Sequence, residues 1–301
     1  MTAERVYTLT ALTDLWTGSV RLDEQKGQLR ERIVPDRLIT TGLLGSIRWW
    51  FEVVVRGLDG HACDPTQDGN RCPDSRRKPS EPGHHCVVCE LFGCTDWARK
   101  FRFDVLDADG KPQQDQITAG DNPSFRLRFT PLRSIEQEEW ALLDLTLRLI
   151  AKYGAIGGKT VLKNRDYGRI AVDIPQGNVT RQVLEQYVKN PRWRSMRHEG
   201  FEWASVTHFW FVESHYLDSR QFNQVVRRNS WLRGSRGTSK KVFSFKNPES
   251  ARRTFGFVQT KDRLGEMRRR LKEKAWGDLD DGEFVNGDEI LRRLLGEGGR
   301  G

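Results

Sequence analysis

The segment between Cys63 and Cys86 places the strongest limit on how this chain can fold. It reads DPTQDGNRCPDSRRKPSEPGHH, which is rich in proline, glycine and charge and shows no hydrophobic periodicity. Such a stretch cannot bury enough apolar surface to order itself. Together with its flanks it carries four of the five cysteines, and a bound metal ion would hold it in place.

The cysteine spacing predicts a structural zinc site. Cys86 and Cys89 form a CxxC pair, a spacing at which two thiolates reach one tetrahedral Zn²⁺. The expected ligands are Cys63, Cys72, Cys86 and Cys89. The substitutes left open are His84, His85 and Cys94. Cys94 stands among apolar residues, which favours a buried free thiol, and no HExxH pattern points to a catalytic zinc. The alternative is five reduced structural cysteines without a metal.

Composition predicts a cytoplasmic protein with no membrane partner. No run approaches the ~18 apolar residues that a membrane span needs. The first ten residues, MTAERVYTLT, lack the apolar core of a signal peptide. An odd number of cysteines argues against the disulfide framework of a secreted protein.

Charge is divided unevenly between the two halves of the chain. Residues 1–150 hold 20 Lys and Arg against 23 Asp and Glu, a net charge of −3. Residues 151–301 hold 30 against 18, a net charge of +12. A basic half indicates a polyanionic partner, most often a nucleic acid, although a solvated basic surface would look the same.

Hydrophobic periodicity predicts an α+β fold. Residues 43–58 and 135–153 have helical spacing, whereas 99–105 and 125–129 alternate as antiparallel strands do. Residues 17–40 are polar and predict a long mobile loop. Arg48, Glu52 and Arg56 are expected on the face of the first helix opposite its apolar stripe. A similar set of elements follows in the second half, which suggests tandem ferredoxin-like (RRM-like) domains over 1–150 and 151–301, with the zinc insert at about 59–94.

The start of the first long helix, TGLLGSIRWW, predicts an anion site. Its first turn has no acid, and glycines there let a ligand approach the free N–H groups of the helix end. The residues expected to bind a phosphate or a base are Gly42, Gly45, Ser46, Arg48 and Trp49. The alternatives are close helix packing at the glycines and a place at the edge of the core for Trp49, while Trp50 is expected in the core.

Two basic loops extend the predicted nucleic-acid surface. The first follows the helix at 135–153 and offers Gly157, Gly158, Lys159, Thr160, Lys163 and Arg165. It lacks the spacing of a Walker phosphate loop. The second, at 227–241, is expected to be a Gly/Ser-rich loop around Trp231 and offers Arg233, Arg236 and Lys240. Basic groups interleaved with an aromatic ring suit single-stranded nucleic acid, and a solvated loop is the alternative.

Several of these motifs together resemble the RAMP superfamily of CRISPR systems, and within it the first Cmr subunits of type III-B effector complexes. The resemblance rests on Trp16-Thr17-Gly18, on Gly45-Ser46-Ile47-Arg48-Trp49-Trp50, on Glu90-Leu91-Phe92-Gly93 and on Trp97-Ala98-Arg99. It covers about residues 7–170. Leu44 stands where the family pattern has an arginine, and Glu52 where a basic residue is common. Binding is therefore expected to depend more on Arg48 and on the second half.

The resemblance implies tandem ferredoxin-like domains and membership of an RNA-guided antiviral complex. The implied partners are other Cmr-complex subunits, the 3′ part of the guide RNA and its target RNA. It implies a non-catalytic subunit, because target cleavage in that complex is attributed to the repeated backbone subunit.

Two other functions stay open. A metal-independent RNA endonuclease, as some RAMP proteins are, would need a general acid or base such as a histidine, Asp23 or Asp36. No acid–base set converges on the glycine motifs, and His208 in THFWF predicts a core histidine. A protein–protein adaptor is disfavoured by the +12 half and would show RNA binding with little salt dependence.

Overall fold

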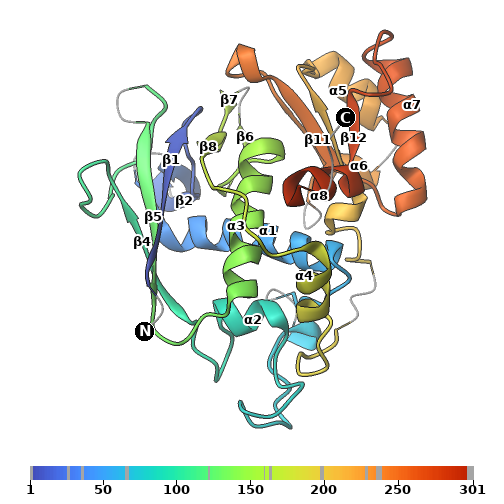
Figure 1. Cartoon of the computed structure of the whole chain (residues 1–301). Coiled ribbons are helices and arrows are strands. Elements are labelled where there is room, and N and C mark those ends of the chain that lie inside the picture. The colour runs from blue at the N-terminus through green and yellow to red at the C-terminus, as the bar shows by residue number, and fades with distance from the viewer. Residues whose placement is uncertain are drawn as a thin grey trace. The chain divides into compact units, whose positions relative to one another are not determined.

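The chain forms two compact units, each assembled from separate stretches of sequence. The computed structural model describes residues 3–25, 28–34, 37–64, 68–120, 123–158, 160–162, 165–196, 200–227, 230–234 and 239–296. The first unit comprises Met1–Trp50, Lys100–Ile135 and Thr146–Pro175. The second comprises Phe51–Arg99, Glu136–Leu145 and Gln176–Gly301. Each unit contains one four-stranded antiparallel sheet with helices, which confirms the predicted α+β class (Figure 1).

The sheet of the first unit has the strand order β4-β5-β1-β8. The strands are β1 (Arg5–Ala11), β4 (Phe101–Leu106), β5 (Ser124–Pro131) and β8 (Ile170–Val172), and every neighbouring pair is antiparallel. One face is apolar and buried: the Phe129 ring lies 5.0 Å from that of Phe101 and 5.8 Å from that of Tyr7. The other face carries charge, where Arg128 pairs with Asp104 at 3.0 Å. The predicted alternation of both strands is thus confirmed.

Two long helices begin or end in this unit. Helix α1 (Thr40–Gly57) and helix α3 (Gln137–Tyr153) confirm the predicted helices at 43–58 and 135–153. Trp50 is 3% exposed, and its Nε1 donates a hydrogen bond to the carbonyl oxygen of Ala155 at 2.9 Å. A Cβ on Gly154 would lie 2.7 Å from the Trp50 ring, so the residue that follows α3 must be small. Trp50 is therefore core, as predicted.

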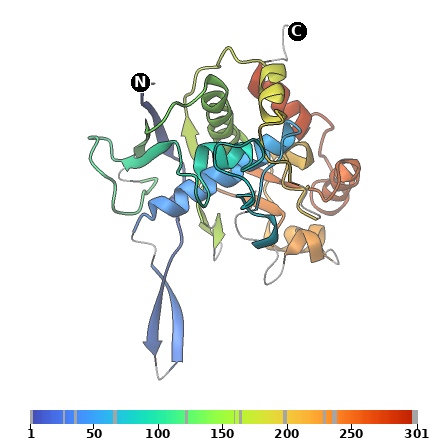
Figure 2. The same ribbon diagram turned by 90° about the horizontal axis from the view of Figure 1, so that it is seen from below.

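The predicted loop at 17–40 is wrong for most of its length. Strands β2 (Ser19–Gln25) and β3 (Gln28–Val34) form an antiparallel hairpin with Val20 opposite Ile33. Figure 2 shows this hairpin extending away from the sheet of its unit. Charged residues interrupt the alternation of apolar residues in these two segments, so the sequence pattern alone did not indicate strands. A second short hairpin joins β6 (Val161–Leu162) to β7 (Arg165–Asp166).

The sheet of the second unit has the order β10-β11-β9-β12. The strands are β9 (Phe209–Glu213), β10 (Val242–Phe245), β11 (Arg253–Phe257) and β12 (Phe284–Asn286), all in antiparallel pairs. Every residue of β11 is buried, so both faces of the sheet are covered. Trp210 and Val212 of β9 pack into one core with Met267 and Leu271.

Helices complete the second unit. They are α2 (Val87–Phe92), α4 (Arg181–Val188), α5 (Ser219–Val226), α6 (Ser230–Arg233), α7 (Leu264–Lys274) and α8 (Gly287–Leu295), with 3₁₀ turns at Asp68–Asn70, Val206–His208, Glu249–Ala251 and Lys261–Arg263. The predicted loop at 227–241 thus contains the short helix α6. Asp218 and Gln221 form a reciprocal capping box at the start of α5.

Glu52 was expected on the polar face of the first helix, opposite its apolar stripe, but the structure buries it. It is 3% exposed and pairs with Arg56 at 3.6 Å. Arg56 also donates to the carbonyl oxygens of Ala204 and Ala62 at 3.1 and 3.3 Å. A contact from far along the chain, at Ala204, therefore covers this side of α1, which its own periodicity could not reveal.

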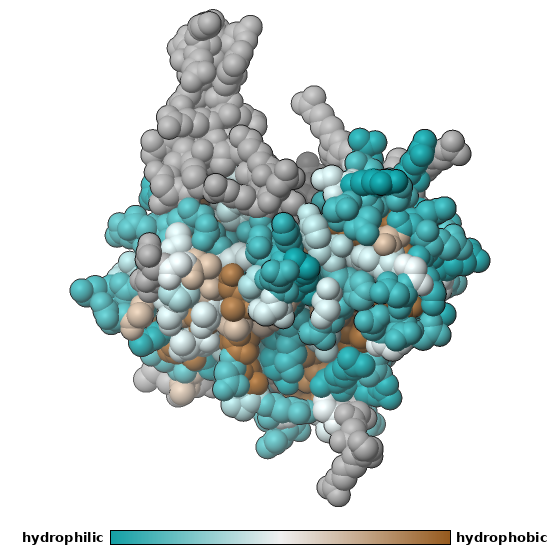
Figure 3. Space-filling view, turned by 90° about the horizontal axis from the view of Figure 1, so that it is seen from above, coloured by the Kyte–Doolittle hydropathy of each residue, from teal (hydrophilic) through white to brown (hydrophobic). Residues whose placement is uncertain are grey.

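On the face shown in Figure 3, the described residues are mainly hydrophilic, with several small hydrophobic patches between them. No helix within the described ranges is both long and apolar enough to cross a membrane.

Replacing Trp50 with Phe should lower the free energy of unfolding by about 1–3 kcal/mol, because the buried carbonyl of Ala155 loses its donor. Urea denaturation would measure this. Leu132→Ala is the control: Leu132 is 64% exposed, and its truncation should change stability by less than about 0.5 kcal/mol. Equal effects of the two substitutions would contradict the role given to Trp50.

Candidate nucleic-acid interface and metal centre

The four cysteines predicted as metal ligands lie together in the second unit. Cys63, Cys72, Cys86 and Cys89 are all buried, and their Sγ atoms lie within 4.8 Å of one another. Cys86 is the N-cap of α2 and Cys89 lies in its first turn, so one helical turn directs both thiols to the same place. Cys63 and Cys72 come from the proline- and glycine-rich segment that precedes Cys86.

The geometry of this cluster fits a tetrahedral metal ion. Four thiolates at about 2.3 Å from one zinc ion would stand about 3.8 Å apart. The Sγ atoms of Cys63 and Cys89 are 3.4 Å apart, and the backbone N–H of Cys86 donates to Sγ of Cys72 at 3.3 Å. Hydrogen bonds with the Cys72 and Cys86 thiols, together with burial, raise the pKa of Cys63. A metal ion would displace the protons that these thiols otherwise share.

The substitute ligands have other partners. Nδ1 of His84 lies 2.9 Å from Nδ1 of His85, and Nε2 of His85 lies 2.6 Å from the Glu90 carboxylate. The ring of His85 also stacks on Trp97 at 4.4 Å. Cys94 lies outside the four-thiol group and is half-buried rather than buried, because it sits in the turn that its backbone closes with Trp97.

The insert is tied to a distant part of its own unit. The carbonyl oxygen of Arg71 accepts a hydrogen bond from Arg194 at 2.9 Å, and that of His85 accepts one from the Arg194 N–H at 2.8 Å. The N–H of Gly83 donates to the carbonyl oxygen of Arg192 at 2.9 Å. A metal that orders the insert would therefore also order residues 192–194.

A second feature, in the first unit, joins three segments that are far apart in sequence. We call it the glycine cluster: Trp16–Gly18, Gly42, Gly45, Ser46, Gly157 and Gly158. Gly158 donates its N–H to the carbonyl oxygen of Trp16 at 2.8 Å, and Gly157 donates to Oγ of Ser46 at 3.0 Å. Oγ1 of Thr17 accepts from the N–H of Ile39 at 2.7 Å, immediately before α1. The predicted helix start and the predicted glycine loop are thus brought together.

Three of these glycines are required by packing. A Cβ on Gly42 would lie 2.6 Å from the carbonyl oxygen of Thr17, and one on Gly157 would lie 2.6 Å from that of Trp16. A Cβ on Gly158 would lie 3.1 Å from Thr17. Close packing, the alternative left open by the sequence, therefore explains all three.

Gly45 is different, because a Cβ there would meet nothing within 4 Å. Gly45, Gly158 and Gly18 are exposed, and they leave backbone accessible beside the start of α1. The first turn of α1 has no acidic residue, so the positive end of the helix dipole is not neutralised there by a carboxylate of that turn. Bare backbone at such an end can accept an anion.

Arg48 and Trp49 are half-buried on α1. The ring of Trp49 packs edge-on against Trp50 with 5.0 Å between centroids. This places Trp49 at the edge of the core, while leaving part of its ring accessible.

The structure describes only some of the residues predicted to bind nucleic acid in the two basic loops. Lys159, Lys163 and Arg236 lie outside the described residues. Thr160 is half-buried, and Arg165 begins β7. Arg233 is exposed at the end of α6, whereas the ammonium of Lys240 lies 4.3 Å from the centroid of the Phe222 ring, and burial lowers its pKa. Lys240 is therefore held by an aromatic ring.

The comparison with known families decides the family. The RAMP superfamily profile matches residues 8–162, more than half of the chain. The chain belongs to the RAMP superfamily. No curated protein matches it. The crystal structure of apo Cmr1 from Pyrococcus furiosus aligns with a TM-score of 0.44 at 10% sequence identity, covering 86% of this chain and 89% of that chain.

The second unit of this RAMP protein also contains a cavity that the sequence did not reveal. Its volume is about 510 Å³, and its lining includes Arg56, His61, Glu202, Ser205 and His208. Nδ1 of His61 lies 2.9 Å from the carbonyl oxygen of Met196, which leaves Nε2 as an acceptor in the neutral ring. Burial lowers the pKa of His208. His208 is half-buried and lines this cavity, so the expected core position is wrong.

In the glycine cluster, Gly42→Ala should lower the free energy of unfolding by about 1–3 kcal/mol, because the new Cβ would overlap the carbonyl oxygen of Thr17. Gly45→Ala is the matched control on the same helix. It should stabilise the protein by about 0.5–1 kcal/mol, because its methyl group enters open space and alanine favours a helix. Thermal unfolding followed by circular dichroism compares the two, and shifts of the same sign would contradict the packing described.

Proposed function

We propose that the chain is a non-catalytic RNA-binding subunit of an RNA-guided type III-B CRISPR (Cmr) antiviral complex. It would contact the 3′ part of the guide RNA, its target RNA, or both. The observation that carries the proposal is the glycine cluster of a RAMP protein, which leaves accessible backbone beside a helix start without acids. The assignment to the Cmr complex rests on the motifs around Trp16, Arg48 and Phe92.

The chemistry of this surface suits a phosphate better than a base edge. Helix-end N–H groups and a nearby guanidinium recognise the charge of a phosphate and carry no sequence information. In the proposed interface Gly42, Gly157 and Gly158 let three backbone segments meet, Gly45 admits the ligand, and Arg48 supplies charge. Ser46 positions the loop through Gly157, and Trp49 offers a stacking edge. Thr160, Lys159, Lys163 and Arg165 would extend it, with Arg233, Arg236 and Lys240 contributing from the basic half.

The fold proposed for this function is a pair of ferredoxin-like domains. In both sheets the strands follow the spatial order second-third-first-fourth, with helices after the first and third, as in a βαββαβ unit. The expected boundary near residue 150 stays a prediction; β8, from beyond it, pairs with β1. Other Cmr subunits are the proposed protein partners and the cytoplasm the proposed location.

The first experiment is a titration of end-labelled single-stranded RNA at two salt concentrations, followed by a denaturing gel of the same samples. We expect salt-sensitive binding and intact RNA, because each phosphate contact with a single strand adds about 0.7 to the slope of log affinity against log salt. Arg48→Glu should weaken binding and lower the slope by at least about 0.7. Arg102→Glu reverses the same charge on the solvent face of β4 and should change neither.

Two outcomes would count against this proposal. Binding that hardly responds to salt would favour the protein–protein adaptor. Cut RNA would favour the second candidate, a metal-independent RNA endonuclease.

The observation that keeps an endonuclease as the second candidate is the cavity with His61 and His208, since paired imidazoles can serve as acid and base. Cleavage in EDTA that disappears in His61→Ala or His208→Ala would establish it. Asp23 lies in β2 opposite Arg30, and Asp36 lies outside the described residues.

We also propose that the four-cysteine centre holds a structural Zn²⁺. Elemental analysis should find one zinc ion per chain, and Cys86→Ser should lose it. Because binding and ordering of the insert are linked, the loss should lower the free energy of unfolding by at least about 2 kcal/mol. Cys94→Ser, which leaves all four proposed ligands in place, should keep the metal. A wild-type protein free of metal and unaffected by chelators would contradict the proposal.

A further inference from the structure

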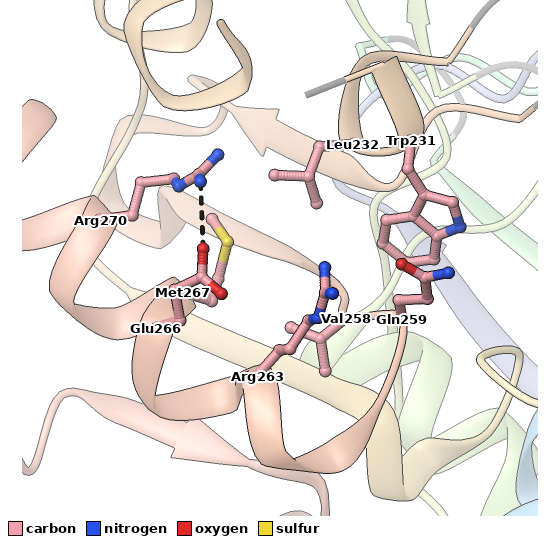
Figure 4. A pocket seen from close by; sticks show the side chains of 8 residues that line it. All are labelled: Trp231, Leu232, Val258, Gln259, Arg263, Glu266, Met267 and Arg270. Atoms are coloured by element: carbon pink, nitrogen blue, oxygen red, sulfur yellow. Dashed lines mark hydrogen bonds and ion pairs between the residues drawn. The ribbon is translucent and has the colours of Figure 1, made fainter. Parts of the chain in front are cut away.

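A groove in the second unit lies outside the glycine cluster and combines an aromatic ring with two guanidinium groups. It runs between α6 and the start of α7, and Figure 4 shows Trp231 and Gln259 on one side with Arg263, Glu266, Met267 and Arg270 on the other. The sequence placed Trp231 in a basic loop suited to single-stranded nucleic acid, but it did not predict Arg263 and Arg270 as its neighbours.

The floor of the groove is apolar, and the hollow above it is shallow. Leu232, Val258 and Met267 are buried and belong to the hydrophobic core of the unit. The enclosed part of the hollow measures only about 20 Å³, enough for about one water molecule. A ligand must therefore lie across the groove instead of being enclosed by it, which favours a chain-like molecule over a small metabolite.

One arginine is fixed and the other is available. Arg270 donates to the carbonyl oxygen of Val225 and to the Glu266 carboxylate, both at 3.2 Å. Arg263 is exposed, and its guanidinium makes no hydrogen bond or ion pair with any residue in the described ranges. In Figure 4 it points into the space between Met267 and Trp231. The carboxylate of neighbouring Asp262 accepts a hydrogen bond from Thr260, and the positive charge of Arg263 also contributes to lowering the pKa of Asp262.

The Trp231 ring is held in place but only half-buried. It packs edge-on against Trp203 with 5.8 Å between centroids, and Nζ of Lys241 lies 5.1 Å from the Trp231 centroid. A braced indole that still borders the groove is a surface on which a planar group can stack with little loss of side-chain freedom.

We propose that this groove binds one nucleotide of a single-stranded RNA, with the base stacked on Trp231 and the adjoining phosphate paired with Arg263. The amide of Gln259 is placed to hydrogen-bond the base or ribose. Only an unpaired base can leave its own stack for a protein ring, so a duplex does not fit. The inference rests on the proposed RNA-binding function and adds a second contact, separate from the glycine cluster.

The test compares the binding of a single-stranded oligouridylate by the wild type and four full-length variants. Arg263→Ala should weaken binding several-fold and lower the salt slope by about 0.7, because one phosphate contact is lost. Trp231→Ala should weaken binding about ten-fold or more with an unchanged slope, because stacking involves no counterion. Trp231→Phe, which keeps an aromatic ring and the fold, should recover most of that loss.

Arg269→Ala is the matched control. Its side chain is on α7, 72% exposed, and paired with Glu273 at 3.9 Å outside the groove, so its loss should leave affinity nearly unchanged. Ultraviolet crosslinking followed by mass spectrometry should also place uridine on the peptide that contains Trp231.

Three results would overturn the inference. Equal affinities for Arg263→Ala, Trp231→Ala, Arg269→Ala and the wild type, with no crosslink at Trp231, would show that the groove does not bind RNA, while leaving the proposed function intact. Equal competition by double-stranded RNA would exclude base stacking. A wild-type protein that binds no RNA at low salt would overturn both this inference and the proposed function.

Discussion

The close approach of the backbone at Trp16 and Thr17 to two glycine-bearing segments is the constraint on which the first unit depends. Carbonyl oxygens at these positions occupy the space that Cβ atoms on Gly42 and Gly157 would need. Hydrogen bonds from Gly158 to Trp16 and from Gly157 to Ser46 then join the segments. Packing and binding make compatible demands here, because the glycines that allow the close backbone contact also lie beside exposed backbone at Gly18, Gly45 and Gly158.

Charged side chains are held in more than one way. Asp104 and Arg128 pair on the solvent face of a sheet whose other face is aromatic. Glu52 is buried and pairs with the half-buried Arg56, which also donates to backbone carbonyls. A buried ion pair of this kind is costly to break from one side, so these two residues are constrained together.

The local sequence pattern predicted individual helices, strands and metal ligands better than it predicted which distant segments meet in the fold. The periodicity around Trp50 and the alternation of Phe101 and Phe125 were sufficient to place α1, β4 and β5, since each has an apolar face to bury. The β2–β3 hairpin was missed, because charged residues interrupt its alternation. The four cysteines could be grouped because metal ligands obey spacing rules, whereas the meeting of Thr17, Gly42 and Gly158 could not be predicted, because no local rule links positions more than 100 residues apart. The groove at Arg263 depends in the same way on α6 and α7 meeting in the fold.

The four-thiol centre has a consequence for how the protein responds to oxidants. Cys63 and Cys89 lie within van der Waals distance of each other, and all four thiols belong to a single donor set. Oxidation of any two of them to a disulfide would remove half of the donors for the proposed zinc ion. The insert and residues 192–194, which it contacts, would then lose their anchor while both sheets remained intact. The insert would thus act as the redox-sensitive part of a protein whose proposed RNA-binding surfaces contain no cysteine.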